Sequence, residues 1–325
     1  KRDWSSDVCS SDLSPVVLPE PPFTHVLNIL CMLPPFDVLA YFMKVDVKEV
    51  TINTPSLLPP TPTHLPVRFS FVALGVNDND MYITPLILGS RQWIRMGIRP
   101  VIALVDFSAA RREEVISLIS QYSETPCLFI TVDSPEPGNT SCSAFIAQNI
   151  RPFIPFLIQD MVRENEYILT SDADIIPLNT AYFQQESIAV NPHTISVFNI
   201  DTKYVYMCFI GARASTWREL YADPQILTDA WFDAKRQGYD LLHKSRSKGW
   251  FMDQILLKRR LLLHKNYVLL RKPQMLLTER IINKLIKTNR SVLPTTVFAL
   301  HRKFYGEDRH KFISECEILI TQHST

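Results

Sequence analysis

The sequence predicts an α/β fold built on a mostly parallel, Rossmann-like sheet. From Arg68 to Leu169, apolar runs of strand length alternate with segments whose apolar residues recur at helical spacing. The last run, Tyr167–Leu169, is followed by two carboxylates one residue apart, Asp172 and Asp174. Open α/β sheets bind ligands outside the carboxyl ends of their strands. We therefore expect helices on both faces of the sheet and a functional site where this strand ends.

The first half is expected to contain four strands and three helices. The strands are Arg68–Val76, Pro100–Val105, Cys127–Val132 and Tyr167–Leu169, and the helices are Tyr82–Met96, Ala109–Tyr122 and Ser143–Asn165. A turn at Asn77–Asp80 is expected to cap the first helix, and Gly97 to end it. Pro152 and Pro155 are expected to bend or split the third helix. Pro177 is expected to stop the fourth strand from continuing.

After Asn179 the pattern changes and predicts a mixed second half that would supply an acceptor site. The expected strands are Thr194–Asn199, Met207–Gly211, Tyr267–Leu270 and Thr296–His301, and the expected helices are Ala214–Ala222, Thr228–Gln237, Phe251–His264 and Thr278–Lys287. His243–Gly249 is a basic loop between them.

The ends of the chain are expected to lie outside this domain. Residues 1–13 resemble the translation of a sequencing adapter, so we expect that the natural N-terminus is missing. Residues 14–66 are rich in proline and predict a stiff linker or stem, or the remnant of an upstream region. The domain is expected at residues 67–312, followed by a tail at 313–325.

Composition and missing motifs exclude several functions. A net charge of +1 gives no indication of nucleic acid or an anionic membrane as the main partner. The six cysteines are widely spaced and form no Cys-x-x-Cys pattern. The first strand is not followed by Gly-x-Gly-x-x-Gly, and no phosphate-binding Gly-x-x-x-x-Gly-Lys motif is present, which argues against dinucleotide oxidoreductases and P-loop enzymes.

The pair Asp172 and Asp174 indicates a divalent cation. Two carboxylates held together repel each other unless a cation lies between them. Magnesium or manganese accepts oxygen ligands and would bridge the pair to phosphate. A solvated turn is the alternative for an isolated Asp-x-Asp, but the apolar strand before it and Ile175 and Ile176 after it favour a metal site.

These features resemble a GT-A type glycosyltransferase, and in motif order the family-8 group that includes glycogenin and lipopolysaccharide galactosyltransferases. The segments that carry the resemblance are Asn79–Leu86, Gln148–Phe153, Thr170–Asp174 and Trp250–Gln254, with His301–Gly306 as a fifth whose spacing departs from the family pattern. The resemblance implies a GT-A fold, manganese or magnesium at a DxD motif, and a nucleotide diphosphate sugar, with uridine diphosphate favoured. The acceptor would be a hydroxyl of a glycan, lipid or protein.

The expected site residues fall into three groups. Asp172, Asp174 and His301 would hold the metal; Asp80, Tyr82, Asp106, Arg151, Lys244, Arg246 and Lys248 would bind the nucleotide sugar; Asp253 and Gln254 would meet the donor sugar or the acceptor hydroxyl. Each has a plainer structural interpretation. Tyr82 would be a core residue, Arg151 would pair with Asp160 or Glu164, His301 would be a structural hydrogen bonder, Asp253 would favour the positive end of a helix, and the basic loop would be solvated.

Two other functions remain open from the sequence. A haloacid-dehalogenase-like phosphatase also has an apolar strand that ends in Asp-x-Asp, and in that class it is the first strand of the core. Here three strands precede the motif. A non-catalytic nucleotide- or carbohydrate-binding module could keep the same fold. Retaining and inverting transfer both stay open. If an N-terminal anchor preceded the proline-rich stem and has been lost, the enzyme would suit the Golgi or secretory lumen. If there was no such anchor, a cytoplasmic enzyme is expected.

Overall fold

A computed structural model describes residues 45–46, 69–120, 127–134, 136, 138–183, 195–197, 207–221, 230, 233–236, 252–264, 267–269, 275–278, 297–306 and 308–324. These residues form an eight-stranded sheet, a three-stranded sheet and helices packed against both. In this part of the chain, no helix combines the length and apolar character needed to span a membrane.

Four parallel strands form the centre of the large sheet, as predicted. They are β2 (Phe69–Asn77), β3 (Arg99–Val105), β4 (Leu128–Val132) and β5 (Tyr167–Thr170), in the spatial order β4-β3-β2-β5. The chain moves outward from β2 to β4 and then returns to the other side of β2 with β5. Such a reversal of strand order opens a crevice at the carboxyl ends of the two central strands, here β2 and β5.

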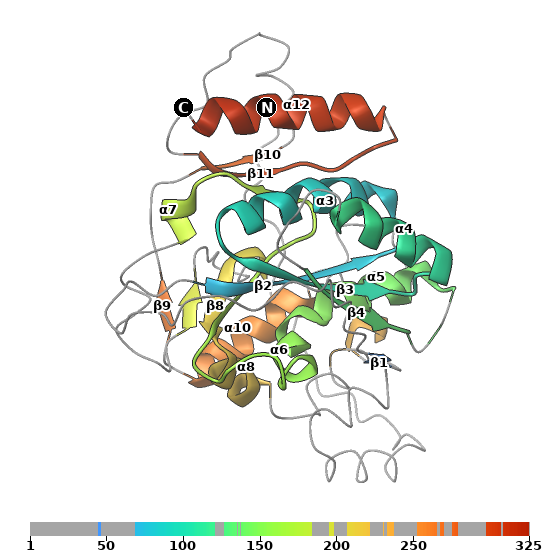
Figure 1. Ribbon diagram of the computed structural model, residues 1–325. Helices are drawn as coiled ribbons and strands as arrows, with labels where there is room; N and C mark the ends of the chain where they lie inside the picture. Colours follow the sequence, from blue (N-terminus) through green and yellow to red (C-terminus); the bar gives the residue numbers. More distant parts are fainter. Residues whose placement is uncertain are drawn as a thin grey trace, which may run out of the picture.

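Helices cover both faces of this sheet (Figure 1). On one face lie α3 (Asp80–Arg95) and α4 (Ala109–Ser120), and on the other α5 (Thr140–Asn149), α6 (Ile154–Leu157), α8 (Ala214–Leu220) and α10 (Met252–His264). Two apolar cores result, one around Trp93 and Phe183 and the other around Phe145 and Trp217. Because both strand faces are buried, the strands read as continuous apolar runs, and this made them predictable.

The second half of the large sheet is mixed, again as predicted. Strand β8 (Ile210–Arg213) pairs antiparallel with β5, β7 (Ile195–Val197) pairs antiparallel with β8, and β9 (Tyr267–Leu269) pairs parallel with β7. At the opposite edge, β1 (Val45–Asp46) pairs antiparallel with β4. This short strand lies inside the segment that we expected to be a linker.

The small sheet lies beyond α3 and has the order β10-β11-β6 (Figure 1). Its strands are Met275–Thr278 (β10), Val297–His301 (β11) and Ile175–Pro177 (β6). Helix α12 (Arg309–Ser324) packs on this sheet through a third apolar core that includes Ile176, Leu300 and Phe312. It crosses the boundary expected at residue 313, so most residues of the expected tail lie in a packed helix.

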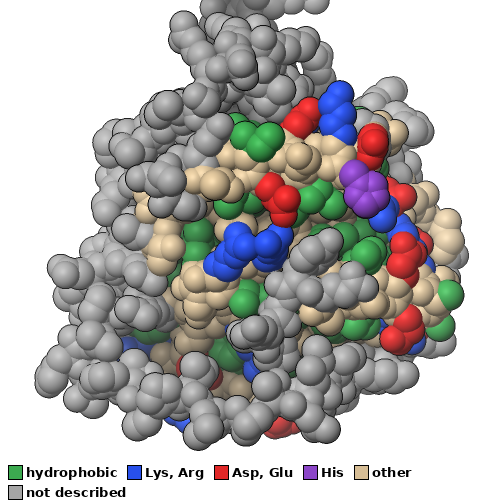
Figure 2. Space-filling view, turned by 45° about the horizontal axis from the view of Figure 1, so that its top comes forward, with side chains coloured by type: hydrophobic (Ala, Val, Ile, Leu, Met, Phe, Trp, Pro, Cys, Tyr) green, Lys and Arg blue, Asp and Glu red, His purple; other side chains and the backbone are tan. Residues whose placement is uncertain are grey.

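The surface that carries α12 is mixed in charge. Figure 2 shows acidic and basic side chains interspersed on this face. One pair joins α3 to α12, because Arg91 Nη1 lies 2.7 Å from Glu317 Oε1. The described side chains on this face therefore present no broad field of a single sign.

One predicted helix was wrong in part. The helix expected at Ser143–Asn165 begins earlier, at Thr140, where the Asn139 side chain accepts hydrogen bonds from the backbone N–H groups of Ser141 and Cys142. It is split as expected, since the chain continues through a 3₁₀ turn, η1 (Arg151–Phe153), and the short α6, but residues 158–166 form turns and bends instead of helix. The reason is that Pro152 and Pro155 lack the N–H that a continuous helix needs.

Other differences concern short strands. Met207–Phe209 forms a 3₁₀ turn, η3, and β8 begins only at Ile210. Thr170 Oγ1 of β5 donates to the Met207 carbonyl oxygen at 2.6 Å and ties this turn to the sheet. Pro177 belongs to strand β6, at the edge of the small sheet, where a missing N–H is tolerated. Half of Thr228–Gln237 is described, and residues 230 and 233–236 are helical there, as expected. All of His243–Gly249 lies outside the described residues, as does the helix expected at Thr278–Lys287 except for Thr278, which belongs to β10.

Candidate active site

The carboxylate pair lies in a tight turn between β5 and β6. The Ser171 N–H donates to the Ala73 carbonyl oxygen of β2 at 3.1 Å, and the Ile175 N–H donates to the Asp172 carbonyl oxygen at 3.2 Å. The Arg302 N–H, just after β11, donates to the Asp174 carbonyl oxygen at 3.0 Å. Both sheets thus fix the turn, which lies at the carboxyl ends of β2 and β5, where the strand order reverses.

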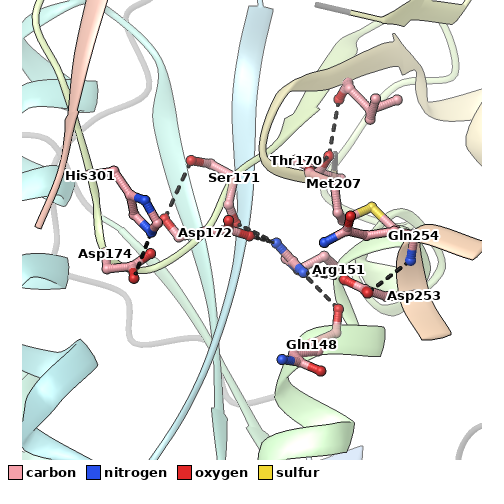
Figure 3. Close-up of polar contacts among 11 residues, drawn as sticks. Gln148, Arg151, Thr170, Ser171, Asp172, Asp174, Met207, Asp253, Gln254 and His301 are labelled. Carbon is pink, nitrogen blue, oxygen red and sulfur yellow. Dashed lines mark hydrogen bonds and ion pairs between the residues drawn. The ribbon is translucent and has the colours of Figure 1, made fainter. Parts of the chain in front are cut away.

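Arg151 links the carboxylate pair to the helix that follows the basic loop (Figure 3). Its side chain is 5% exposed and forms an ion pair through Nη1 with Asp172, and its Nη2 lies 2.9 Å from Asp253 Oδ2. Its Nε donates to the Gln148 carbonyl oxygen and Nη1 to that of Ser171. The alternative pairing with Asp160 or Glu164 was therefore wrong. A planar guanidinium held at this many points is a rigid spacer between two acids.

The charge of Arg151 is secured by its neighbours. Burial alone would lower the pKa of Arg151, but Asp172 and Asp253 outweigh burial and raise that pKa above its ordinary value. Without these acids a buried cation would be strongly destabilised.

Asp253 is a buried acid at the start of α10. Its side chain is 4% exposed, and Oδ1 accepts from the Gln254 N–H at 2.8 Å, as the positive end of a helix favours. Burial raises the pKa of Asp253 to about 6, against the opposing effect of Arg151. The Gln254 Oε1 atom is buried without a hydrogen-bond partner among the described residues. Both residues lie beside Arg151 in Figure 3, so the structure brings together three predicted site residues from different segments.

Asp174 faces the other predicted ligand, His301. The distance from Asp174 Oδ2 to His301 Nε2 is 3.0 Å, and β11 places the imidazole there through its pairing with β6, in which His301 lies opposite Ile175. Burial lowers the pKa of His301, but the hydrogen bond and charge of Asp174 outweigh burial and leave the pKa raised. Asp172 and Asp174 therefore turn to opposite sides, the first toward Arg151 and the second toward His301 (Figure 3).

The side chains of Asp172, Asp174 and His301 are of the chemical types that bind a hard divalent cation. Two carboxylates and an imidazole are ligands that manganese accepts, and magnesium accepts the carboxylates. Within the described residues, however, no three His, Cys, Asp or Glu side chains converge closely enough to form a metal site. Asp172 and Asp174, with His301, are the residues that would hold such an ion.

Tyr82 is engaged by a lysine that the sequence analysis did not single out. Lys303 Nζ lies 3.2 Å from the Tyr82 hydroxyl and 5.1 Å from the centre of its ring. The Phe304 N–H donates to the Met81 carbonyl oxygen at 3.0 Å, so the segment after β11 lies against the first turn of α3. The only signal in the sequence was the position of Lys303, two residues after His301.

Among the described residues, Asp80 and Asp106 contact partners outside this network. Asp80 pairs with Arg111 of α4 and Arg309 of α12. Asp106 follows β3 with a φ of 57°, in the left-handed region that aspartate tolerates, and accepts from the Ser134 N–H at 2.6 Å. Lys244, Arg246 and Lys248 lie outside the described residues.

No protein-family model and no curated protein sequence matches the chain. Among solved structures, the chain is similar to the galactosyltransferase LgtC in complex with donor and acceptor sugar analogs: 12% identity, 77% of this chain, 95% of that chain and a TM-score of 0.45. It is also similar to the glycosyltransferase GlyE of Streptococcus pneumoniae TIGR4, with 12% identity over 79% of this chain and 63% of that one, at a TM-score of 0.42. A third similar structure is the bifunctional glycosyltransferase WbbM, with 12% identity over 82% of this chain and 53% of that one, at a TM-score of 0.43. At these values the similarity assigns no role to any residue.

Proposed function

We propose that the chain is a metal-dependent glycosyltransferase of GT-A type, which transfers a sugar from a nucleotide diphosphate sugar to a hydroxyl acceptor. The observation that carries the proposal is the placement of Asp172 and Asp174 at the carboxyl end of β5, in the crevice where the strand order reverses. Open α/β sheets bind nucleotides at this position.

The donor groups around the crevice suit a diphosphate leaving group. A cation bound by Asp172, Asp174 and His301 would neutralise the charge that develops on the leaving diphosphate. Lys303 supplies a further positive charge. Burial lowers the pKa of Lys303, but Tyr82 and Asp174 outweigh burial and raise that pKa, so the amine stays protonated. Tyr82 offers an aromatic face beside it.

Asp253 and Gln254 form the sugar side of the proposed site. Arg151 holds Asp253 at a fixed place relative to Asp172, which would keep a donor sugar in register with its diphosphate. With a pKa of about 6, Asp253 is mainly ionised at neutral pH and can accept a hydrogen bond from a sugar hydroxyl. Such a pKa also suits a general base that deprotonates the acceptor hydroxyl, as inverting transfer requires. Asp253 is therefore compatible with inverting transfer as a base and with retaining transfer as a residue that holds the donor sugar.

Calorimetric titration of the full chain with uridine diphosphate, with and without manganese, tests this proposal. We expect binding that requires manganese and is weakened at least tenfold by Asp174→Ala, because that change removes a metal ligand. Asp160→Ala is the matched control, since Asp160 is an exposed acid in a turn away from the crevice. Folded wild-type protein that binds neither uridine nor guanosine diphosphate would refute the proposal.

A further inference from the structure

A small cavity lies beside Asp253. It is lined by residues of α5, η1, η3 and α10, by Tyr221 just after α8 and by Ala230, and its polar members are Asn149, Tyr221 and Asp253. Its volume is about 10 Å³, the order of space that one water molecule requires. A water molecule is retained in a cavity of this size where polar groups give it two to four hydrogen-bond partners, whereas an apolar cavity stays dry.

Tyr221 supplies a buried hydroxyl at this cavity. It follows the end of α8, and its oxygen has no hydrogen-bond partner among the described residues. The ring is held by edge-on packing against Phe153, with centroids 5.3 Å apart, and by Trp217 at 6.1 Å. Burial, reinforced by the charge of Asp253, raises the pKa of Tyr221, so the hydroxyl remains a donor at neutral pH. A buried donor left unsatisfied destabilises the folded state, and buried tyrosine hydroxyls usually find a partner.

Asp253 has acceptor capacity that its known partners do not fill. One oxygen accepts from the Gln254 N–H and the other from Arg151, and the backbone N–H of Asp253 is a third donor to the group. Each carboxylate oxygen has two lone pairs, so the group can accept about one further hydrogen bond. A water molecule in the cavity can therefore accept from the Tyr221 hydroxyl and donate to this carboxylate.

We propose that Tyr221 is a positioning residue for Asp253 and acts through a water molecule held in this cavity. Arg151 would then hold one oxygen of the carboxylate directly, and Tyr221 would restrain the same carboxylate through the water molecule. This inference rests on the proposed function, in which Asp253 meets the donor sugar. Other charges near the pair are Asp172, which faces Asp253 across Arg151, and Arg260 of α10, which lies near Tyr221.

A double-mutant cycle separates positioning from simple packing. Tyr221→Phe keeps the ring and removes only the hydroxyl, and Asp253→Asn removes the charged acceptor. Affinity for UDP-galactose and for uridine diphosphate is measured by calorimetry with manganese in the wild type, both single variants and the double variant. We expect Tyr221→Phe to weaken UDP-galactose binding about fivefold in the wild-type background and less than twofold beside Asp253→Asn, while uridine diphosphate binding stays within twofold.

The matched control is Tyr182→Phe. Tyr182 is equally buried but lies in α7 (Thr180–Phe183), on the other face of the sheet. We expect no difference between its effects on the two ligands. An equal effect of Tyr221→Phe in both Asp253 backgrounds, or no effect in either, would overturn the positioning role.

The cycle also has a readout that needs no ligand. Urea-unfolding midpoints of the same four proteins shift non-additively if Tyr221 and Asp253 are coupled, and additively if they are not. If wild-type protein bound neither nucleotide, the proposed function would fail, and the midpoints alone would decide whether the two residues are linked. Additive shifts would then overturn the inference by themselves.

Discussion

At the scale of the residue, Asp253 shows how burial sets a charge state. Its pKa is raised from 3.8 to about 6, first by burial and against the pull of Arg151. A carboxyl group whose folded pKa lies above its unfolded value binds its proton more tightly in the folded state. Its contribution to stability is therefore fully present below pH 3.8 and is lost as the pH rises through about 6.

This sign gives a prediction for Asp253→Asn. Between pH 5 and pH 7.5, the free energy of unfolding of the wild type should fall by about 1.4 kcal/mol relative to that of the variant, because only the wild type loses the bound proton. Urea unfolding at several pH values, with a chelator present to exclude metal effects, measures this difference. A difference that is constant or grows with pH would contradict the assigned pKa.

At the scale of the element, the long buried strands were predictable and the short ones were not. Strands β2, β3, β4 and β5 are apolar on both faces, so each appears as an unbroken run in the sequence. Strand β6 has three residues and exists because it pairs with β11, more than 120 positions away. A segment this short has no usable periodicity, and its partner cannot be deduced from local pattern.

The candidate site divides in the same way. Asp172 and Asp174 could be predicted because they follow a recognisable strand. The bridge from Arg151 to Asp253 joins residues 102 positions apart, and the position of Lys303 on Tyr82 depends on how the chain returns after β11. Tyr221 was missed because a tyrosine at the end of an amphipathic helix has no local feature that distinguishes it from a core residue.

The contact of α5 with β2 gives a prediction at this scale. A Cβ atom added to Gly75 would lie 2.1 Å from the Ala147 carbonyl oxygen and 2.9 Å from Ile150 Cγ2, so the helix would have to move away from the sheet. We expect Gly75→Ala to lower the free energy of unfolding by about 3 kcal/mol, the upper range for overpacking. Chemical denaturation followed by circular dichroism measures the loss.

Gly97→Ala is the control for Gly75→Ala. Gly97 has a φ of 76° but nothing within 4 Å of an added Cβ, so only the left-handed backbone is penalised. That conformation costs about 1–2 kcal/mol in a residue other than glycine. If Gly75→Ala were no more destabilising than Gly97→Ala, the close packing of α5 on β2 would not be the reason for this glycine.

At the scale of the whole molecule, α12 completes the domain that carries the site. The Arg302 side chain extends into this helix, with Nη2 2.6 Å from Glu315 Oε2 and its guanidinium 4.5 Å from the centre of the Phe312 ring. The backbone N–H of the same arginine donates to the Asp174 carbonyl oxygen. A single residue thus connects the packing of α12 to the turn that holds the carboxylate pair.

This connection predicts that α12 unfolds together with the sheet. Phe312 is fully buried between α12 and the small sheet, and Phe312→Ala should lower the free energy of unfolding by about 3–4 kcal/mol through loss of buried area and an unfilled cavity. Ile318→Ala, on the exposed side of the same helix, should cost less than about 1 kcal/mol. Because Arg302 joins α12 to the turn at Asp174, tryptophan fluorescence and far-ultraviolet circular dichroism should report one coincident transition in both variants. Two separate transitions, with α12 lost first and nucleotide binding retained, would show that the helix is an independent appendage.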